Sequence, residues 1–143
     1  MDNLDTNKNL KIKMNKDFDQ WNEKKKKIDA KQEQLFFKQV EIWWVNFGCN
    51  VGYEMDGKGV EYTRPAIIIK KYNKFSFLAI PLSTARKTNF YKISVGIIAG
   101  KEAVANLSQI KNIDSRRLVK KIGRLNAAIF EEVKKKASLV NFG

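Results

Sequence analysis

The stretch PAIIIKKYNKFSFLAIPL, residues 65–82, decides the fold of this chain. Two apolar runs, AIIIKKY and FSFLAIPL, flank the dipeptide Asn73-Lys74, which has the polar character of a turn. Continuous apolar runs of this length are typical of strands that are buried on both faces. The stretch therefore predicts a hairpin of buried strands.

More strands are expected on both sides of this hairpin. Residues 40–47 are rich in β-branched and aromatic side chains, and residues 48–59 contain four glycines among polar residues, which predicts a strand followed by a long loop. Further strands fit residues 90–95, 104–109 and 118–125, with a basic corner at residues 113–117. Many short strands in about 100 residues indicate a mainly β fold, a small, strongly bent antiparallel barrel of the SH3-like kind.

Helices are expected at both ends of the barrel. Phe18, Trp21, Ile28 and Leu35 recur at helical spacing and predict an amphipathic helix that starts near Asp17. This helix either steers or docks a partner, or it covers the barrel or a dimer seam with its lysines in solvent. A second helix follows residue 126, which is a favoured N-cap type, with residues 131–132 acidic and 134–136 basic. We expect a polar extension at residues 1–38 and a barrel domain at 39–143.

Composition limits the chemistry. The 143 residues include 28 Lys and Arg against 15 Asp and Glu, a formal charge of +13, which suits a polyanion such as nucleic acid. With one cysteine and no histidine, the usual transition-metal ligands and the commonest general base are missing, so we expect no metal and no cofactor. The longest aliphatic run, residues 66–69, cannot span a bilayer. We expect no membrane contact and a cytoplasmic location.

Five sequence blocks, taken together and in this order, resemble the MazF/PemK toxins. They are EIWWVNFG (41–48), VGYE (51–54), TRPAIII (63–69), AIPLST (79–84) and LSQIKNID followed by SRRL (107–118). The resemblance implies a dimeric barrel of a type II toxin-antitoxin system that cuts single-stranded mRNA without a metal. In that chemistry the ribose 2′-hydroxyl attacks the adjacent phosphate and leaves a 2′,3′-cyclic phosphate and a 5′-hydroxyl. The implied partners are RNA, a cognate antitoxin and a second copy of the chain.

The resemblance also assigns candidate residues. The arginine of the Arg-Pro pair is Arg64, the strand hydroxyl is Ser83 with Thr84 beside it, and the loop carboxylate is Glu54. Ser83 stands where the family has threonine, and the span from Gly52 to Arg64 exceeds the family's usual length. Both features separate this chain from its apparent relatives.

The residue types fit these assignments. The guanidinium of Arg64 offers paired donors to the charge that develops on a phosphate, while its high pKa makes it a poor base. Glu54 is either a catalytic helper or a solvated or paired charge. Because strands alternate, we expect only one of Ser83 and Thr84, and only one of Trp43 and Trp44, to face a given side. The candidate RNA contacts are Tyr53, Lys70, Arg86, Lys87, Gln109 and Lys111.

Three alternatives share the same barrel. One is a non-catalytic gyrase inhibitor like the CcdB poisons, against which the Arg-Pro and Gln-Ile-Lys blocks argue. The second is a plain nucleic-acid-binding module. The third is a domesticated toxin whose N-terminal helix blocks the RNA groove.

Overall fold

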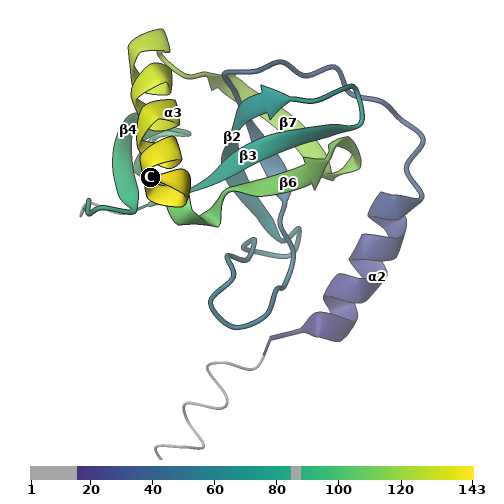
Figure 1. Cartoon of the computed structure of the whole chain (residues 1–143). Coiled ribbons are helices and arrows are strands. Elements are labelled where there is room, and N and C mark those ends of the chain that lie inside the picture. Colours follow the sequence, from purple (N-terminus) through teal and green to yellow (C-terminus); the bar gives the residue numbers. More distant parts are fainter. Residues whose placement is uncertain (1–15, 85–87) are drawn as a thin grey trace, which may run out of the picture.

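The computed structural model describes residues 16–84 and 88–143, and its elements carry the labels of Figure 1. Helix α2 (Phe18–Asp29) precedes the strands and helix α3 (Ala127–Phe142) follows them. The strands are β1 (Glu41–Asn46), β2 (Thr63–Lys71), β3 (Ser76–Ser83), β4 (Lys92–Ile98), β5 (Lys101–Asn106), β6 (Lys111–Asp114) and β7 (Leu118–Arg124). Two short 3₁₀ turns, η1 (Leu107–Gln109) and η2 (Ser115–Arg117), flank β6.

The strands form one bent antiparallel sheet in the order β4-β5-β3-β2-β1-β7, with β6 also paired to β3. The predicted hairpin of buried strands is β2–β3, and it lies in the middle of this order. The edge of β3 is divided between two partners, because Ser76 to Ala79 pair with β6 whereas Leu82 and Ser83 pair with β5. The sheet must bend where β3 changes partner. The predicted mainly β, barrel-like fold with a helix at each end is confirmed.

The central strands are buried on both faces. In β2, Ile67 and Ile69 face a core that includes Phe130 and Val133 of α3, whereas Ile68 on the alternate side faces a second core with Phe77. Figure 1 shows α3 lying beside the sheet near β4. This double burial explains why the hairpin reads as continuous apolar runs.

The N-terminal helix is shorter than its apolar spacing predicts. It ends at Asp29, and Leu35 lies in an extended segment that packs against the second core. Phe37 in this segment is fully buried, with its ring centroid 5.0 Å from that of Phe77. Burying Phe37 against the sheet outweighs the local helical pattern.

The predicted strand at 104–109 ends at Asn106. An unexpected strand, β6, overlaps the start of the basic corner, and η2 forms the rest of it. The predicted strand at 90–95 begins later and runs to Ile98. The predicted cap at Asn126 is confirmed, since its side chain accepts hydrogen bonds from the amides of Ala128 and Ile129. The charges of α3 lie outside its terminal turns and so add little to the helix dipole. No helix among the described residues is both long and apolar enough to cross a membrane.

A buried carboxylate joins the start of β1 to its neighbours. Glu41 is 4% exposed and accepts hydrogen bonds from the Trp43 indole at 3.0 Å and from the Lys38 amide at 2.8 Å, and it pairs with Lys121 at 2.8 Å. Burial by itself raises the pKa of Glu41, but the donors from Lys121, Trp43 and Lys38 together lower it below its ordinary value. The ionised form is therefore the one that this fold stabilises.

Glu41→Gln is expected to lower the free energy of unfolding at pH 7 by about 1–3 kcal/mol, because a neutral amide replaces a charged acceptor. The pKa of Glu41 is lowered on folding, so its contribution is complete above the unfolded value and is lost as pH falls through the folded value. Urea unfolding at pH 7 and pH 3 measures this. The exposed Glu131→Gln is the control, and an equal deficit of Glu41→Gln at both pH values would contradict the prediction.

Candidate functional site

A cavity of about 490 Å³ lies where β2 begins and β3 ends. It brings together three of the residues that the sequence singled out, Arg64, Ser83 and Thr84. The remaining lining residues are Trp44, Lys58, Gly59, Thr63, Pro65, Leu82, Ile98, Ala99, Lys101 and Ala103. Segments far apart in the sequence, namely β1, the loop before β2, the end of β3 and the β4–β5 turn, thus share one site.

The charged side chains in the described lining of this cavity are basic. Among the described residues that line it, Lys58, Arg64 and Lys101 are basic and none is Asp or Glu. A concave site with three cations and no carboxylate attracts an anion. The mixture of cations with Trp44 and small polar side chains suits a phosphate that carries an attached base.

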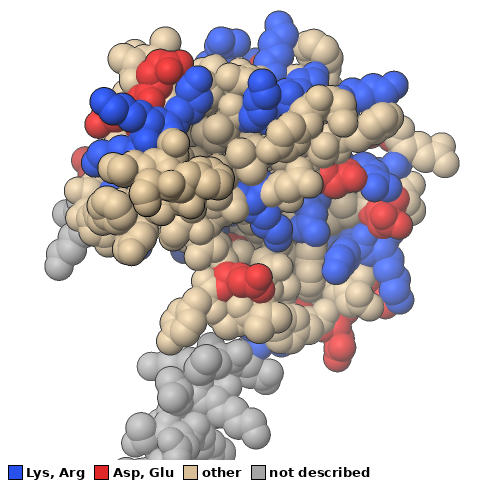
Figure 2. Space-filling model, viewed as in Figure 1, with Lys and Arg blue, Asp and Glu red and all other residues tan. Residues whose placement is uncertain are grey.

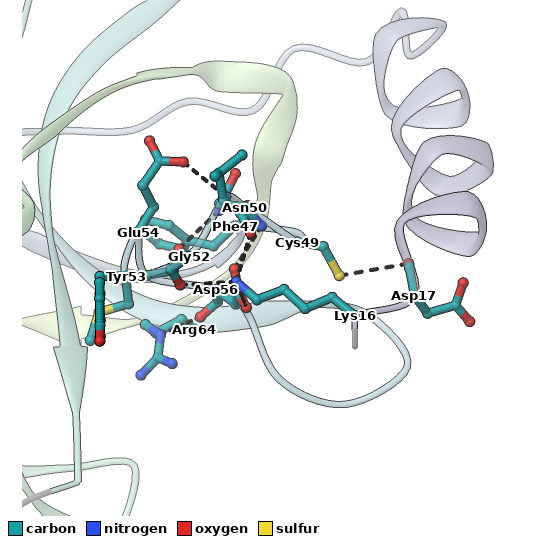
Figure 3. Close-up of polar contacts among 12 residues, drawn as sticks. Lys16, Asp17, Phe47, Cys49, Asn50, Gly52, Tyr53, Glu54, Asp56 and Arg64 are labelled. Carbon is teal, nitrogen blue, oxygen red and sulfur yellow. Dashed lines mark hydrogen bonds and ion pairs between the residues drawn. The ribbon is translucent and has the colours of Figure 1, made fainter. Parts of the chain in front are cut away.

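Arg64 is held by backbone carbonyls on two sides. Its side chain donates from Nε to the Asp56 carbonyl at 2.6 Å (Figure 3). It also donates from Nη1 to the Leu82 carbonyl at 3.2 Å. The residue is 8% exposed, and no hydrogen bond among the described residues uses Nη2. The guanidinium is therefore fixed in position and keeps donors for a ligand.

Burial lowers the pKa of Arg64 from its ordinary value, and the nearby Asp56 carboxylate partly opposes that shift. A buried cation without a direct carboxylate partner gains free energy when an anion binds beside it. The buried positive charge of Arg64 therefore adds to the attraction of this cavity for an anion.

The hydroxyl of Ser83 is oriented by a residue that sequence reasoning missed. Asn106, 3% exposed, donates from Nδ2 to the Pro81 carbonyl at 3.0 Å and to Ser83 Oγ at 3.2 Å. Because the Pro81 contact fixes which way the amide faces, Ser83 Oγ accepts from Asn106. Its longer contact to Asn106 Oδ1, 3.4 Å, competes weakly for the hydroxyl proton. Ser83 can thus donate that proton to a bound oxygen.

The expectation that only one of Ser83 and Thr84 faces the site is wrong. Both line the cavity, since β3 ends at Ser83 and strand alternation no longer applies to the next residue. For the two tryptophans alternation holds: Trp43 is buried in the second core, while Trp44 lines the cavity.

A second cavity, of about 470 Å³, collects four other candidate residues: Tyr53, Glu54, Gln109 and Lys111. The Gln109 side chain ties this cavity to the loop, because it accepts from the Met55 amide at 3.1 Å and donates to the Tyr53 carbonyl at 3.4 Å. Glu54 accepts from the Val51 amide at 2.9 Å, and in Figure 3 its carboxylate points away from Arg64. Glu54 and Arg64 therefore line separate cavities.

Lys111 carries the positive character of this second cavity. Its pKa is lowered first by burial and then by the positive charges of Arg117 and Lys25, and Glu54 opposes the shift. Neighbouring like charges favour a bound anion here as well. Figure 2 shows basic side chains at several places on the visible face, with smaller groups of acidic side chains among them.

Three candidate RNA contacts lie elsewhere. Lys70 is exposed near the far end of β2, six residues from Arg64, which is about 20 Å along a strand. It lines neither cavity. Arg86 and Lys87 lie outside the described residues. Among the residues that are described, no group of three or more Cys, Asp or Glu side chains is placed to hold a metal ion.

The sequence contained little to indicate Lys58, Lys101, Asp56 and Asn106. Lys58 stands between two glycines in the loop and Lys101 follows Gly100 in the β4–β5 turn, so their approach to Arg64 depends on how the sheet bends. Asp56 acts on Arg64 through its backbone carbonyl, which any residue type carries. Asn106 falls inside the strand predicted at residues 104–109, and only the structure places it at the end of β5 beside Ser83.

Comparisons with known proteins agree on one family. A family model described as the PemK-like, MazF-like toxin of type II toxin-antitoxin systems matches residues 38–140. A MazF from Deinococcus radiodurans is similar in fold, with a TM-score of 0.63 at 21% identity over 74% of this chain and 96% of that one. A mycobacterial endoribonuclease solved in complex with its cognate antitoxin gives 0.56 at 14% identity over 76% and 98%. A search of curated protein sequences found no match.

The positive cavity predicts salt-dependent binding of single-stranded nucleic acid. Lys101→Met is expected to reduce the slope of log affinity against log salt concentration by about 0.7, the value of one lost phosphate contact on a single strand. Fluorescence anisotropy with a labelled oligonucleotide between 50 and 200 mM salt measures the slope, and Lys135→Met on the exposed side of α3 is the matched control. Equal slopes for the two variants would show that Lys101 does not contact the nucleic acid.

Proposed function

We propose that this chain, which belongs to the PemK-like, MazF-like toxin family of type II toxin-antitoxin systems, is an endoribonuclease that cuts single-stranded RNA without a metal. The observation that carries the proposal is the meeting of Arg64 and Ser83 in a cavity whose charged lining residues, among those that the structure describes, are all basic. A site of this kind can bind a scissile phosphate and stabilise the charge that its reaction develops.

The chemistry is an internal transesterification. The 2′-hydroxyl oxygen of the ribose bonds to the adjacent phosphorus while the bond from phosphorus to the 5′-oxygen breaks. The 2′-hydroxyl gives up one proton and the leaving 5′-oxygen takes one, so the products are a 2′,3′-cyclic phosphate and a 5′-hydroxyl. No water or redox partner is consumed in this step.

Arg64 and Ser83 have distinct roles in that step. The fixed guanidinium of Arg64 neutralises the charge on the nonbridging oxygens, and the Ser83 hydroxyl donates a hydrogen bond to one of them. Thr84 offers a second hydroxyl at the same wall. We assign proton abstraction to neither Arg64 nor Glu54, because arginine is a poor base and Glu54 lines the other cavity.

The second cavity is proposed to hold nucleotides that flank the cut. Tyr53 is 99% exposed and offers an aromatic face for stacking, while Gln109 and Lys111 supply hydrogen-bond and charge contacts. This division puts cleavage at Arg64 and base recognition at the loop.

The proposed partners follow from family membership. A mycobacterial relative and a MazF from Deinococcus radiodurans were each crystallised with an antitoxin or MazE. By analogy we propose that this chain pairs with a cognate antitoxin, acts as a homodimer and works in the cytoplasm on mRNA.

Arg64→Ala is expected to reduce the rate of RNA cleavage by at least about 1,000-fold, since it removes the principal charge that faces the phosphate. Cleavage of a long single-stranded RNA in the presence of EDTA, with mapping of the new ends, measures this. A 2′-deoxy nucleotide at the cut site should abolish the reaction. No cleavage by the wild type, or equal cleavage by Arg64→Ala, would refute the proposed activity.

Ser83→Ala is expected to lower kcat by about 100-fold, the effect of losing one donor to a developing oxyanion. Ser83→Thr, which restores the family's residue, should retain activity because the hydroxyl remains. Single-turnover cleavage at saturating enzyme separates this effect from binding. If Ser83→Ala and Ser83→Thr cut equally fast, the hydroxyl has no part in the reaction.

A further inference from the structure

Helix α2 packs against the loop at residues 47–62, which joins β1 to β2 and supplies part of the wall around Arg64. In Figure 1 this loop extends toward the N-terminal end of α2, away from α3. None of residues 16–38 is among those lining the Arg64 cavity. The described part of the N-terminal extension thus lies behind the loop, which does not favour a helix that blocks the site.

The apolar contact centres on Trp21. The side chain is 5% exposed, and its ring centroid lies 5.3 Å from that of Tyr62. On the other side the ring lies directly over Gly48, where an added Cβ would come within 2.1 Å of it. Gly48 also has a φ of +78°, so both the backbone and the close approach require glycine. Trp21 therefore holds both ends of the loop at once.

Tyr62 is the strained residue in this contact. Its φ of +53° is rare for an aromatic residue, and it stands two positions before Arg64. The Tyr62 carbonyl accepts from the amides of Phe47 and Gly48, and its hydroxyl donates to Gln20 of α2 at 3.2 Å. A backbone strained in this way persists only where its surroundings hold it. Part of that support comes from α2.

Polar contacts extend the connection to the middle of the loop. Lys16 contacts the carbonyls of Asn50 at 2.6 Å and Gly52 at 3.2 Å, and it pairs with the Asp56 carboxylate at 2.9 Å. The other Asp56 oxygen accepts from the Asn50 amide at 2.7 Å. Figure 3 shows the Lys16 side chain crossing from the start of α2 to these groups. The backbone carbonyl of Asp56 is the acceptor for Arg64 Nε.

From this chain of contacts we propose that α2 positions Arg64, by holding the loop at residues 47–62 in the conformation in which the Asp56 carbonyl binds the guanidinium. Trp21 and Lys16 are positioning residues, since neither touches the cavity. The effect of α2 on the cleavage rate rests on the proposed function. The effect of α2 on the position of Arg64 does not, because it is a property of the protein without RNA.

The first measurement follows Arg64 itself. In ¹⁵N NMR spectra the Arg64 Nε–H, assigned by its loss in Arg64→Lys, should exchange slowly with solvent in the wild type. Trp21→Ala should make the exchange of Arg64 Nε–H at least tenfold faster. The Gly57 amide, which donates to the Gly48 carbonyl, should speed up to the same extent, while the amides of β3 stay protected. Trp21→Phe should restore slow exchange in part, and Phe18→Ala, on the same helix but 47% exposed, should leave it unchanged.

The second measurement follows cleavage. Trp21→Ala should lower kcat at least tenfold with less than a twofold change in affinity for a 2′-deoxy analogue, a split that general destabilisation would not produce. Lys16→Met should also lower kcat with little change in affinity, and Lys16→Arg should restore kcat. These two variants test the proposal even if Trp21→Ala fails to fold.

The two proposals fail in different ways. If the wild type does not cut RNA, the proposed activity is wrong, and Arg64 Nε–H exchange still decides the role of α2. Unchanged exchange in Trp21→Ala and Lys16→Met would overturn the positioning role whatever the activity. Faster exchange with an unchanged kcat in an active enzyme would support the contact between α2 and the loop and overturn its predicted effect on the cleavage rate.

Discussion

The hydrogen bond from Arg64 Nε to the Asp56 carbonyl is the interaction on which the site depends. The bond joins the start of strand β2 to the long loop before it. It fixes the guanidinium of Arg64, a residue that is 8% exposed, and leaves the positive charge in place. A carboxylate in the same place would have satisfied Arg64 and reduced its affinity for a phosphate. A backbone carbonyl fixes the direction of the side chain and leaves its positive charge available.

That arrangement requires support from three sides. The Leu82 carbonyl of β3 accepts from Nη1, the bent sheet brings Lys101 and Ser83 to the same wall, and the loop is held from behind by α2. The loop contains a left-handed Tyr62 and a Gly48 covered by an indole ring, neither of which is stable by local preference. The cavity around Arg64 is thus combined here with an N-terminal helix that packs behind the loop on which Arg64 depends.

Some of this could be predicted from residues alone. The hairpin at residues 65–82, the cap at Asn126 and the family blocks depend on local patterns, and the structure has each of them. The length of the first helix and the strand β6 could not be predicted in this way. Leu35 departs from the helical pattern because its segment buries Phe37 against the sheet, and β6 forms because the edge of β3 accepts it.

The sequence by itself determined the fold class, the cationic character and the identity of Arg64, Ser83 and Thr84 as candidates, because apolar spacing, charge and ordered motifs are properties of the chain. Only the tertiary structure decided that these three residues share a cavity with Lys58 and Lys101, and that Glu54 lines a different one. The same is true of Asn106 behind Ser83 and of Trp21 over Gly48. Such pairings depend on where the sheet bends and where a helix lies against a loop, and residues far apart in sequence meet only when the chain has folded.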